Sequence, residues 1–213
     1  MNIRYFLSLI LIFAFFTGYS QYHYGIKTGL NINKQKFSPN LNSNSNGQNA
    51  HDVFGYINTF HFGVTGDYFI NNSFGITSEL LYEVKGTHYN KTELSQGFDH
   101  KLTYISLPVL FDYSIFRPLT LQAGVETGYL LKTEDTYKQT EGILDDIDQF
   151  NRLEFSGIVG FKYDLPANVY LSIRYIHGIT SLLPDLINRD ANEEHNIDLL
   201  NRTYQLSIGY VLK

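Results

Sequence analysis

The chain has 213 residues, of which 43% are hydrophobic, and it contains no cysteine. This length suits one domain better than two separate cores, and the lack of cysteine excludes a disulfide framework and a thiolate metal site. Charged residues make up only 17% of the chain, against about 25% in ordinary soluble domains. The net charge is −5 and no segment is rich in lysine and arginine, so nucleic acid is not expected as a partner.

The first residues have the pattern of a secretory signal peptide. Residues 5–16 are apolar, and Gly18 and Ser20 are small residues at the positions that a signal peptidase reads. A retained membrane helix is the alternative, but this apolar run is about a dozen residues long and a membrane helix needs about 20. We expect a signal peptide over residues 1–20, cleavage after Ser20, and a mature domain over residues 21–213.

From Tyr22 onward the hydrophobic residues recur at every second position, which is the period of a β-strand and not of a helix. In the first segment, Tyr24 and Ile26 alternate with Gly25 and Lys27. The expected strands cover residues 22–32, 60–70, 74–85, 104–115, 119–132, 153–163, 169–178 and 204–212. Within a membrane, strands satisfy all their backbone polar groups only when they close into a barrel.

The connections between these segments alternate in length. Long polar connections are expected at residues 33–55, 90–99, 133–150 and 181–198, and short turns at residues 71–73, 116–118 and 165–168. Long external loops and short periplasmic turns are typical of membrane barrels. The sequence therefore predicts an all-β, eight-stranded antiparallel up-and-down transmembrane β-barrel with both termini in the periplasm.

The volume of the barrel interior decides which face of the strands points inward and which points to lipid. A soluble ligand-binding barrel would carry its apolar face inward, but an eight-stranded barrel has an interior barely wide enough for side chains. The many large side chains of the apolar face do not fit there, so we expect them to face lipid.

The other face combines repeated glycines with charged residues, and we expect it to line the lumen. The expected lumen charge network consists of Lys27, Glu79, Glu126, Lys162 and Arg174. Arg174 is expected near the middle of the membrane, paired with Glu79, Glu126 or both, because these residues lie at similar depth on strands that run in the same direction.

Several segments carry a family resemblance. They read HYGIKTGLN at residues 23–31, SELLYEVKG at 78–86, YISLPVLF at 104–111, GIVGF at 157–161 with Tyr175 after it, and QLSIGY at 205–210. In these stretches the chain resembles the porin-like, or PorT-like, outer-membrane β-barrel family of Bacteroidetes. The resemblance implies a barrel in the cell outer membrane, and a founding member is associated with protein secretion, but it implies no transported solute. One departure is the end of the sequence, Tyr210-Val-Leu-Lys213, where membrane barrels usually finish on an aromatic residue.

Other constellations favour no cofactor, metal or catalytic site. One long loop is acidic, with Glu134, Asp135, Glu141, Asp145, Asp146 and Asp148. It lacks the glycine spacing of a calcium loop, and we interpret it as a solvated loop rather than as an ion site. The histidines are scattered singly. His177 is expected to face lipid without a serine beside it, and nucleophilic catalysis needs such a partner within hydrogen-bond reach, so we expect no enzyme.

The function expected from the sequence is that of an integral, non-enzymatic outer-membrane barrel with a lumen filled by polar side chains. Its external loops would contact partners. A narrow pore for ions or very small solutes, and an accessory component of a protein secretion system, remain alternatives. The expected partners are outer-membrane lipid, lipopolysaccharide and the barrel-assembly machinery, while the sequence indicates no specific protein partner.

Overall fold

The computed structural model describes residues 22–38, 54–90, 97–137, 147–184 and 198–212. The strands are β1 (Tyr22–Ser38), β2 (Phe54–Gly55), β3 (Ile57–Phe69), β4 (Phe74–Tyr89), β5 (Phe98–Phe116), β6 (Leu119–Tyr137), β7 (Leu153–Asp164), β8 (Val169–Gly178) and β9 (Asp198–Val211). A short 3-10 helix, η3 (Ile147–Gln149), precedes β7. Among the residues that the structure describes, no helix is long and apolar enough to cross a membrane.

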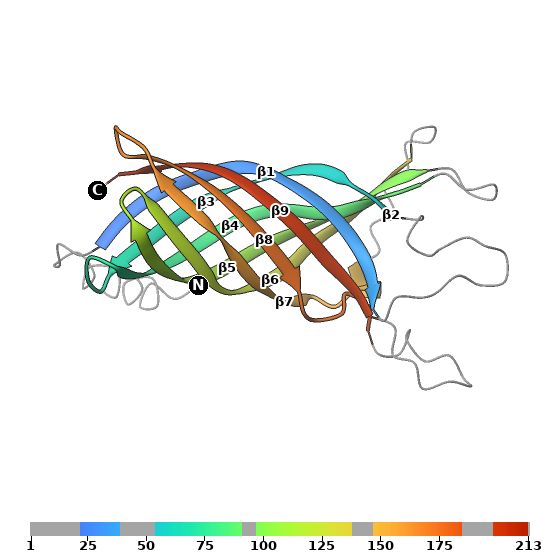
Figure 1. Cartoon of the computed structure of the whole chain (residues 1–213). Coiled ribbons are helices and arrows are strands. Elements are labelled where there is room, and N and C mark those ends of the chain that lie inside the picture. Colours follow the sequence, from blue (N-terminus) through green and yellow to red (C-terminus); the bar gives the residue numbers. More distant parts are fainter. Residues whose placement is uncertain (1–21, 39–53, 91–96, 138–146, 185–197, 213) are drawn as a thin grey trace, which may run out of the picture.

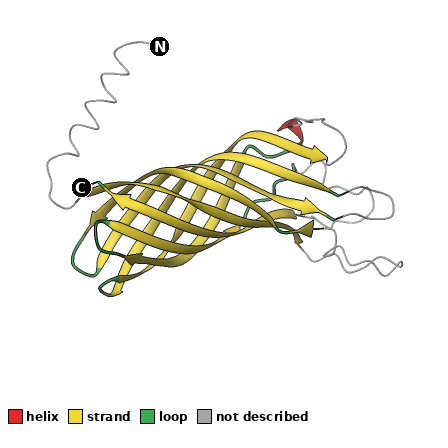
Figure 2. Ribbon diagram, turned by 90° about the horizontal axis from the view of Figure 1, so that it is seen from above, coloured by secondary structure: helices red, strands yellow, loops and turns green. Residues whose placement is uncertain are grey.

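Eight of the nine described strands close a ring. Their order is β4-β3-β1-β9-β8-β7-β6-β5, and β5 pairs back with β4. All of these pairs are antiparallel, while the two-residue β2 lies against the far end of β4. Figures 1 and 2 show the tilted strands winding around a common axis. The expected eight-stranded antiparallel up-and-down barrel is therefore confirmed.

The two ends of the barrel differ. Three tight turns lie at one end, together with the start of β1 and the end of β9 (left in Figure 1); we call it the turn end and the opposite one the loop end. In the β3–β4 turn, Asn71 Oδ1 accepts bonds from the backbone N–H groups of Ser73 at 2.8 Å and Phe74 at 2.9 Å. Such a side-chain bond to its own turn is a common reason for asparagine at this position.

The strands extend farther at the loop end than the sequence analysis predicted. Residues 33–38 were assigned to a loop, yet they belong to β1 and pair with β9, with Asn33 opposite Thr203 and Gln35 opposite Asn201. Likewise, β5 begins at Phe98 and β6 continues to Tyr137. The prediction was wrong here because the side chains on both faces are polar, as with the inward Asn33 and Gln35 and the outward Lys34 and Lys36, so these strand ends read as loops.

Several sequence-based expectations lie outside the described residues. They concern the signal peptide at residues 1–20 and the remaining parts of the four long connections, at residues 39–53, 91–96, 138–146 and 185–197.

The two faces of the barrel wall have the predicted polarity. Outward side chains such as Leu30 (59% exposed) and Ile173 (52% exposed) are apolar, whereas the inward Glu79 and Arg174 are 3% and 2% exposed. This arrangement is the reverse of a soluble ligand-binding barrel, whose apolar face would point inward.

Candidate functional site in the barrel interior

The middle of the barrel is crossed by an ionic bridge between opposite walls. Arg174 on β8 donates from Nη1 and Nη2 to the two carboxylate oxygens of Glu79 on β4, at 2.8 and 2.9 Å. Its Nε and Nη2 also donate to Gln122 Oε1, at 3.0 and 2.8 Å. Lys27 on β1 donates to Glu79 Oε2 at 3.0 Å and to Gln205 Oε1 at 2.9 Å. Because β4 and β8 are opposite in the strand order, this middle layer spans the lumen.

A second layer lies toward the loop end around Lys85. Its ammonium contacts Glu126 at 2.7 Å, Glu83 at 3.3 Å and Glu154 at 3.4 Å, and it lies 5.1 Å from the centre of the Tyr104 ring. These carboxylates come from β4, β6 and β7. Three carboxylates therefore share one ammonium. The Oε2 atoms of Glu83 and Glu126 have no hydrogen-bond partner within the described part of the chain.

A third layer lies toward the turn end. Lys162 on β7 contacts Asp67 Oδ2 on β3 and Asp112 Oδ2 on β5, both at 3.4 Å. Thr77 Oγ1 lies between the two carboxylates, 2.6 Å from Asp67 Oδ1 and 2.8 Å from Asp112 Oδ2. Gln122 Nε2 donates to Asp112 Oδ1 at 2.9 Å, which joins this layer to the middle one. The middle and third layers thus form one connected network, and the layer around Lys85 lies on its loop-end side.

A cavity of about 760 Å³ lies at the turn end. The residues that line it include the third-layer residues Asp67, Asp112 and Lys162, but none of the charged residues of the other two layers. The cavity is therefore a vestibule that is bounded on its inner side by the third layer.

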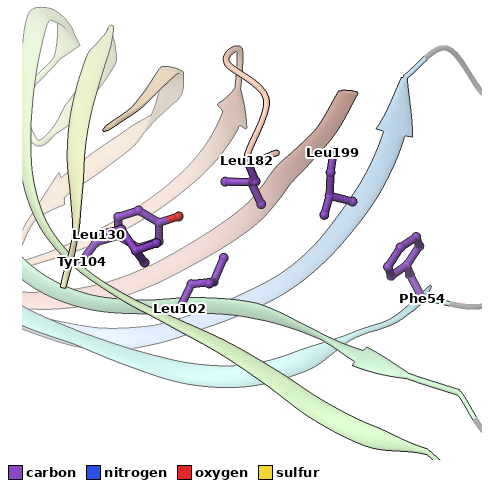
Figure 3. Close-up of a cluster of buried hydrophobic side chains, with 6 residues drawn as sticks. All are labelled: Phe54, Leu102, Tyr104, Leu130, Leu182 and Leu199. Atoms are coloured by element: carbon purple, nitrogen blue, oxygen red, sulfur yellow. The ribbon is translucent and has the colours of Figure 1, made fainter. Parts of the chain in front are cut away.

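The loop end is closed differently, by apolar side chains. Figure 3 shows six that point into the barrel: Phe54, Leu102, Tyr104, Leu130, Leu182 and Leu199. Leu182 lies beyond the end of β8, and its backbone is hydrogen-bonded on both sides. Its N–H donates to the carbonyl of Leu199 at 2.8 Å, and its carbonyl accepts from the N–H of Asn151 at 2.8 Å. This segment is therefore fastened over the mouth of the barrel.

The structure places all five residues of the predicted charge network inside the barrel, each at most 6% exposed. It brings Lys27, Glu79 and Arg174 together in one layer. Lys162 lies in the third layer, and Glu126 pairs with Lys85 instead of Arg174.

Sequence reasoning did not assign a role to the other charged partners, which are Glu83, Lys85, Glu154, Asp67 and Asp112. Each lies at an inward position in the same two-residue alternation as the predicted residues. That alternation alone could have placed them in the lumen.

The acidic loop residues that the structure describes contact basic side chains at or near the loop end. The pairs are Glu134 with Lys132 at 2.5 Å, Asp135 with His100 at 2.5 Å, and Asp148 with Arg152 at 3.2 Å. Glu141, Asp145 and Asp146 lie outside the described residues. Among the residues that are described, no group of three histidine or acidic side chains is arranged to hold a metal ion.

Solved outer-membrane barrels resemble this chain. Neisserial surface protein A aligns over 88% of this chain and 96% of its own, with 12% identity and a TM-score of 0.52. The attachment invasion locus protein Ail of Yersinia pestis aligns over 90% of this chain and 99% of its own, with 15% identity and a TM-score of 0.48. At these identities the likeness concerns the fold.

The expectation that the chain is not an enzyme requires correction. The solved barrels that match it include the outer membrane protease OmpT from Escherichia coli, which aligns over 91% of this chain and 97% of its own, with 10% identity and a TM-score of 0.39. The exclusion that we drew from the surroundings of His177 is withdrawn.

No curated protein matches the sequence. The family model described as outer membrane protein beta-barrel domain matches residues 17–183, which is most of the chain. Together with the closed ring of strands, the apolar outer face and the polar lumen, this match shows that the chain is an outer-membrane protein that belongs to the outer membrane protein beta-barrel domain family.

Proposed function

We propose that this protein is a closed membrane anchor that presents a rigid protein-contact surface outside the cell. In this proposal the loop end faces the exterior and the turn end faces the periplasm, since long connections of membrane barrels are external and short ones periplasmic. The partner contacts belong to the loop end. The lumen serves to stabilise the barrel and does not conduct solutes.

The observation that carries the proposal is the set of bridges across the lumen. Arg174 and Glu79 join opposite walls in the middle layer, and Lys162 and Asp67 join the opposite strands β7 and β3 in the third layer. An ion that passed through would have to break buried ion pairs, which is costly in a medium of low polarity. The apolar cluster of Figure 3 adds a further closure at the loop end.

The contact surface that we propose consists of the outward side chains of a three-stranded extension of the wall, formed by residues 84–89, 98–103 and 132–137, and excludes its buried inward side chains such as Lys85 and Leu102. Here β4, β5 and β6 remain paired beyond the last pair between β3 and β4 (His61 with Glu83) and the last between β6 and β7 (Tyr129 with Leu153). Figure 1 shows these strands projecting at the loop end.

The extension has its own internal contacts. The rings of Tyr89 and Phe98 stack at 4.4 Å, and His88 contacts Asp99 at 2.6 Å. Burial raises the pKa of Tyr89 to about 12, in keeping with a ring that packs inside the extension. These contacts support a preformed surface, which loses little conformational entropy when a partner binds.

We further infer that the chain belongs to the porin-like, PorT-like branch of outer-membrane barrels. The support is the set of strand motifs at residues 78–86, 104–111 and 205–210. This inference adds no transported solute to the proposal.

The experiment that tests the closed lumen is planar-bilayer recording of the purified protein. We expect no steady openings from the native chain, compared with a protein-free detergent blank. Steady openings whose size or ion selectivity changes in the variant Glu79→Gln would overturn the proposal and show a narrow pore, because a contaminating channel would not respond to a substitution in this lumen. Openings that the variant leaves unchanged are assigned to a contaminant, and a preparation freed of them is then expected to be silent.

The contact surface is tested separately, by chemical crosslinking on whole cells followed by purification of the barrel. Crosslinks to the three-stranded extension are expected. Stable co-purification of periplasmic proteins joined to the turn end would instead favour an accessory role in secretion and would contradict the assignment of partner contacts to the loop end.

A further inference from the structure

Three basic side chains form a row on the outer surface of the wall near the loop end. Lys34 on β1 lies directly opposite Arg202 on β9, and Arg202 lies directly opposite His177 on β8. All three occupy outward positions in the alternation, and His177 is exposed while the two others are half-buried. Lys36 follows Lys34 on the same face of β1, one step nearer the loop end. We call these four residues the basic row.

The basic row begins where the apolar band ends. On each of its three strands, the next outward residue toward the middle of the barrel is apolar or aromatic. These residues are Ile32 on β1, Tyr175 on β8 and Tyr204 on β9. The rings of Tyr175 and Tyr204 pack at 5.1 Å, and tyrosine is enriched where a barrel crosses from hydrocarbon to headgroups. The row therefore lies at headgroup depth in the leaflet on the side of the loop end.

No member of this row forms an ion pair within the described part of the chain. Ion pairs are recorded for Lys132 and Arg152 elsewhere near the loop end, at 2.5 and 3.2 Å, but none for Lys34, Lys36 or Arg202. Like charges directly opposite each other on neighbouring strands are destabilising. Lys34 and Arg202 are in that position, so the pair is unfavourable until an anion lies between them.

The side chains are also positioned for such an anion. Arg202 Nη1 donates to the carbonyls of Gly178 at 2.9 Å and Asn201 at 2.8 Å, which fixes the guanidinium against the wall. No described residue accepts from its Nε or Nη2. Lys34 Nζ lies 5.4 Å from the centre of the Tyr56 ring. Tyr56 is 62% exposed, and a cation over an exposed ring is held only weakly.

We propose that the basic row binds the phosphate groups of a phosphorylated glycolipid in the outer leaflet. Phosphate oxygens accept from arginine and lysine in charge-assisted hydrogen bonds, which are the strong ones. A membrane-embedded headgroup is favoured over a soluble anion because the row adjoins a lipid-facing apolar surface. Basic residues near a membrane surface attract anionic lipids. The inference rests on the proposed orientation, in which the loop end faces the cell exterior.

The test uses the whole barrel in nanodiscs of phosphatidylcholine that contain a small fraction of lipid A, which carries two phosphates. The lipid that remains bound after extraction into mild detergent is measured by native mass spectrometry. The double variant Lys34→Gln with Arg202→Gln is compared with the double variant Lys132→Gln with Arg152→Gln, which removes the same charge near the same end. We expect roughly tenfold less retained lipid A for the first variant, since each basic residue near the membrane surface adds to the binding of anionic lipid. We expect little change for the second, because Lys132 and Arg152 are already paired with Glu134 and Asp148.

Two further arms keep the outcome decisive. The single variant Lys34→Gln leaves the wall contacts of Arg202 intact and should lose a smaller part of the lipid A, while lipid A without its phosphates should be retained poorly by the native chain. Equal losses in the two double variants, or equal retention without phosphates, would overturn the inference. In nanodiscs that contain equal small fractions of lipid A and phosphatidylglycerol, preferential retention of phosphatidylglycerol would overturn this inference. A silent planar-bilayer recording with no retained lipid A would sink only the lipid site, because the closed lumen does not depend on it.

Discussion

Arg174 is one of the largest buried side chains in the described interior. It is 2% exposed, and four of its hydrogen bonds hold Glu79 and Gln122 on two other strands. Its neighbour on β7 is Gly160, where an added Cβ would collide with the carbonyl of Ile173 and the side chain of Arg174. The absence of a side chain at Gly160 therefore leaves room for the side chain of Arg174.

The first prediction concerns the Arg174–Glu79 bridge. Arg174→Met should destabilise the barrel by about 3 to 5 kcal/mol, because it removes the bidentate partner of a buried carboxylate and leaves Lys27 as its one remaining cation. Adding Glu79→Gln should recover part of the loss. The measurement is urea unfolding in detergent, with the surface variant Arg152→Met as control. An unchanged midpoint for Arg174→Met would contradict a structural role of the bridge.

A second prediction concerns Gly160. Gly160→Ala should destabilise the barrel by roughly 1 to 3 kcal/mol, the usual cost of overpacking, because two of the three nearest atoms to the new Cβ, Ile173 O and Arg174 Cα, belong to the backbone. Gly157 on the same strand is the matched control, since a Cβ there would meet only Ile179 Cδ1 at 3.9 Å. The thermal unfolding temperatures of the two variants are compared, with unfolding monitored by the change in electrophoretic mobility. If both behave alike, the close approach of β7 and β8 at Gly160 is not a constraint.

At the scale of elements, the layer around Lys85 joins strands β4, β6 and β7 through one ammonium and three carboxylates. Because of this imbalance, we expect the removal of the ammonium and the removal of one carboxylate to have different effects on stability. Removing Lys85 leaves three buried negative charges together, whereas neutralising one carboxylate removes part of their mutual repulsion.

The third prediction follows from that imbalance. Glu126→Gln should leave the unfolding midpoint unchanged or raise it, while Lys85→Met should lower it strongly, by about 3 to 5 kcal/mol. Both variants are compared in the same urea series with the native chain. A larger loss for Glu126→Gln than for Lys85→Met would show that the carboxylates are not in excess in this layer.

Strand positions and faces could be predicted from the sequence through most of the wall, because one face is apolar and the other is not. The period-two signal failed at the loop end, where residues such as Asn33 and Gln35 are polar and yet buried. The register shift in the β5–β6 pair between Thr103 and Tyr104 could not be predicted either. The extra residue lies in β6, where Leu131 and Lys132 are both exposed, so the buried positions of β6 change from Leu130 before the shift to Thr133 after it.

At the scale of the whole molecule, the partners in the lumen depend on ring closure. Alternation predicted that Glu79, Glu126 and Arg174 all point inward, but not which of them meet. Glu79 on β4 is opposite Arg174 on β8 in the strand order, while Glu126 on β6 lies nearer to Lys85 in depth. Such contacts require the strand order and the shear of the closed barrel, which one sequence does not specify.

The fourth prediction concerns export. The pattern Gly18-x-Ser20 after a short apolar run predicts that the mature protein begins at Gln21. Intact-mass measurement of the protein purified from outer membranes should therefore show the loss of residues 1–20. A mass that includes residues 5–16 would mean that the apolar segment is retained.

The last prediction fixes the direction of the whole barrel in the membrane. The sequence contains no cysteine, so a single introduced cysteine gives labelling without background. Tyr56, which is 62% exposed, lies between β2 and β3 at the loop end, and Asn72 lies in the β3–β4 turn at the opposite end.

Because connections at the short-turn end of membrane barrels are periplasmic, a membrane-impermeant maleimide added to whole cells should label Tyr56→Cys and spare Asn72→Cys. Both should react after the outer membrane is permeabilised, which controls for access. Labelling of Asn72→Cys alone in intact cells would reverse the orientation. It would then place the three-stranded extension and the basic row on the periplasmic side, and both proposals for the loop end would fail together while the closed lumen would stand.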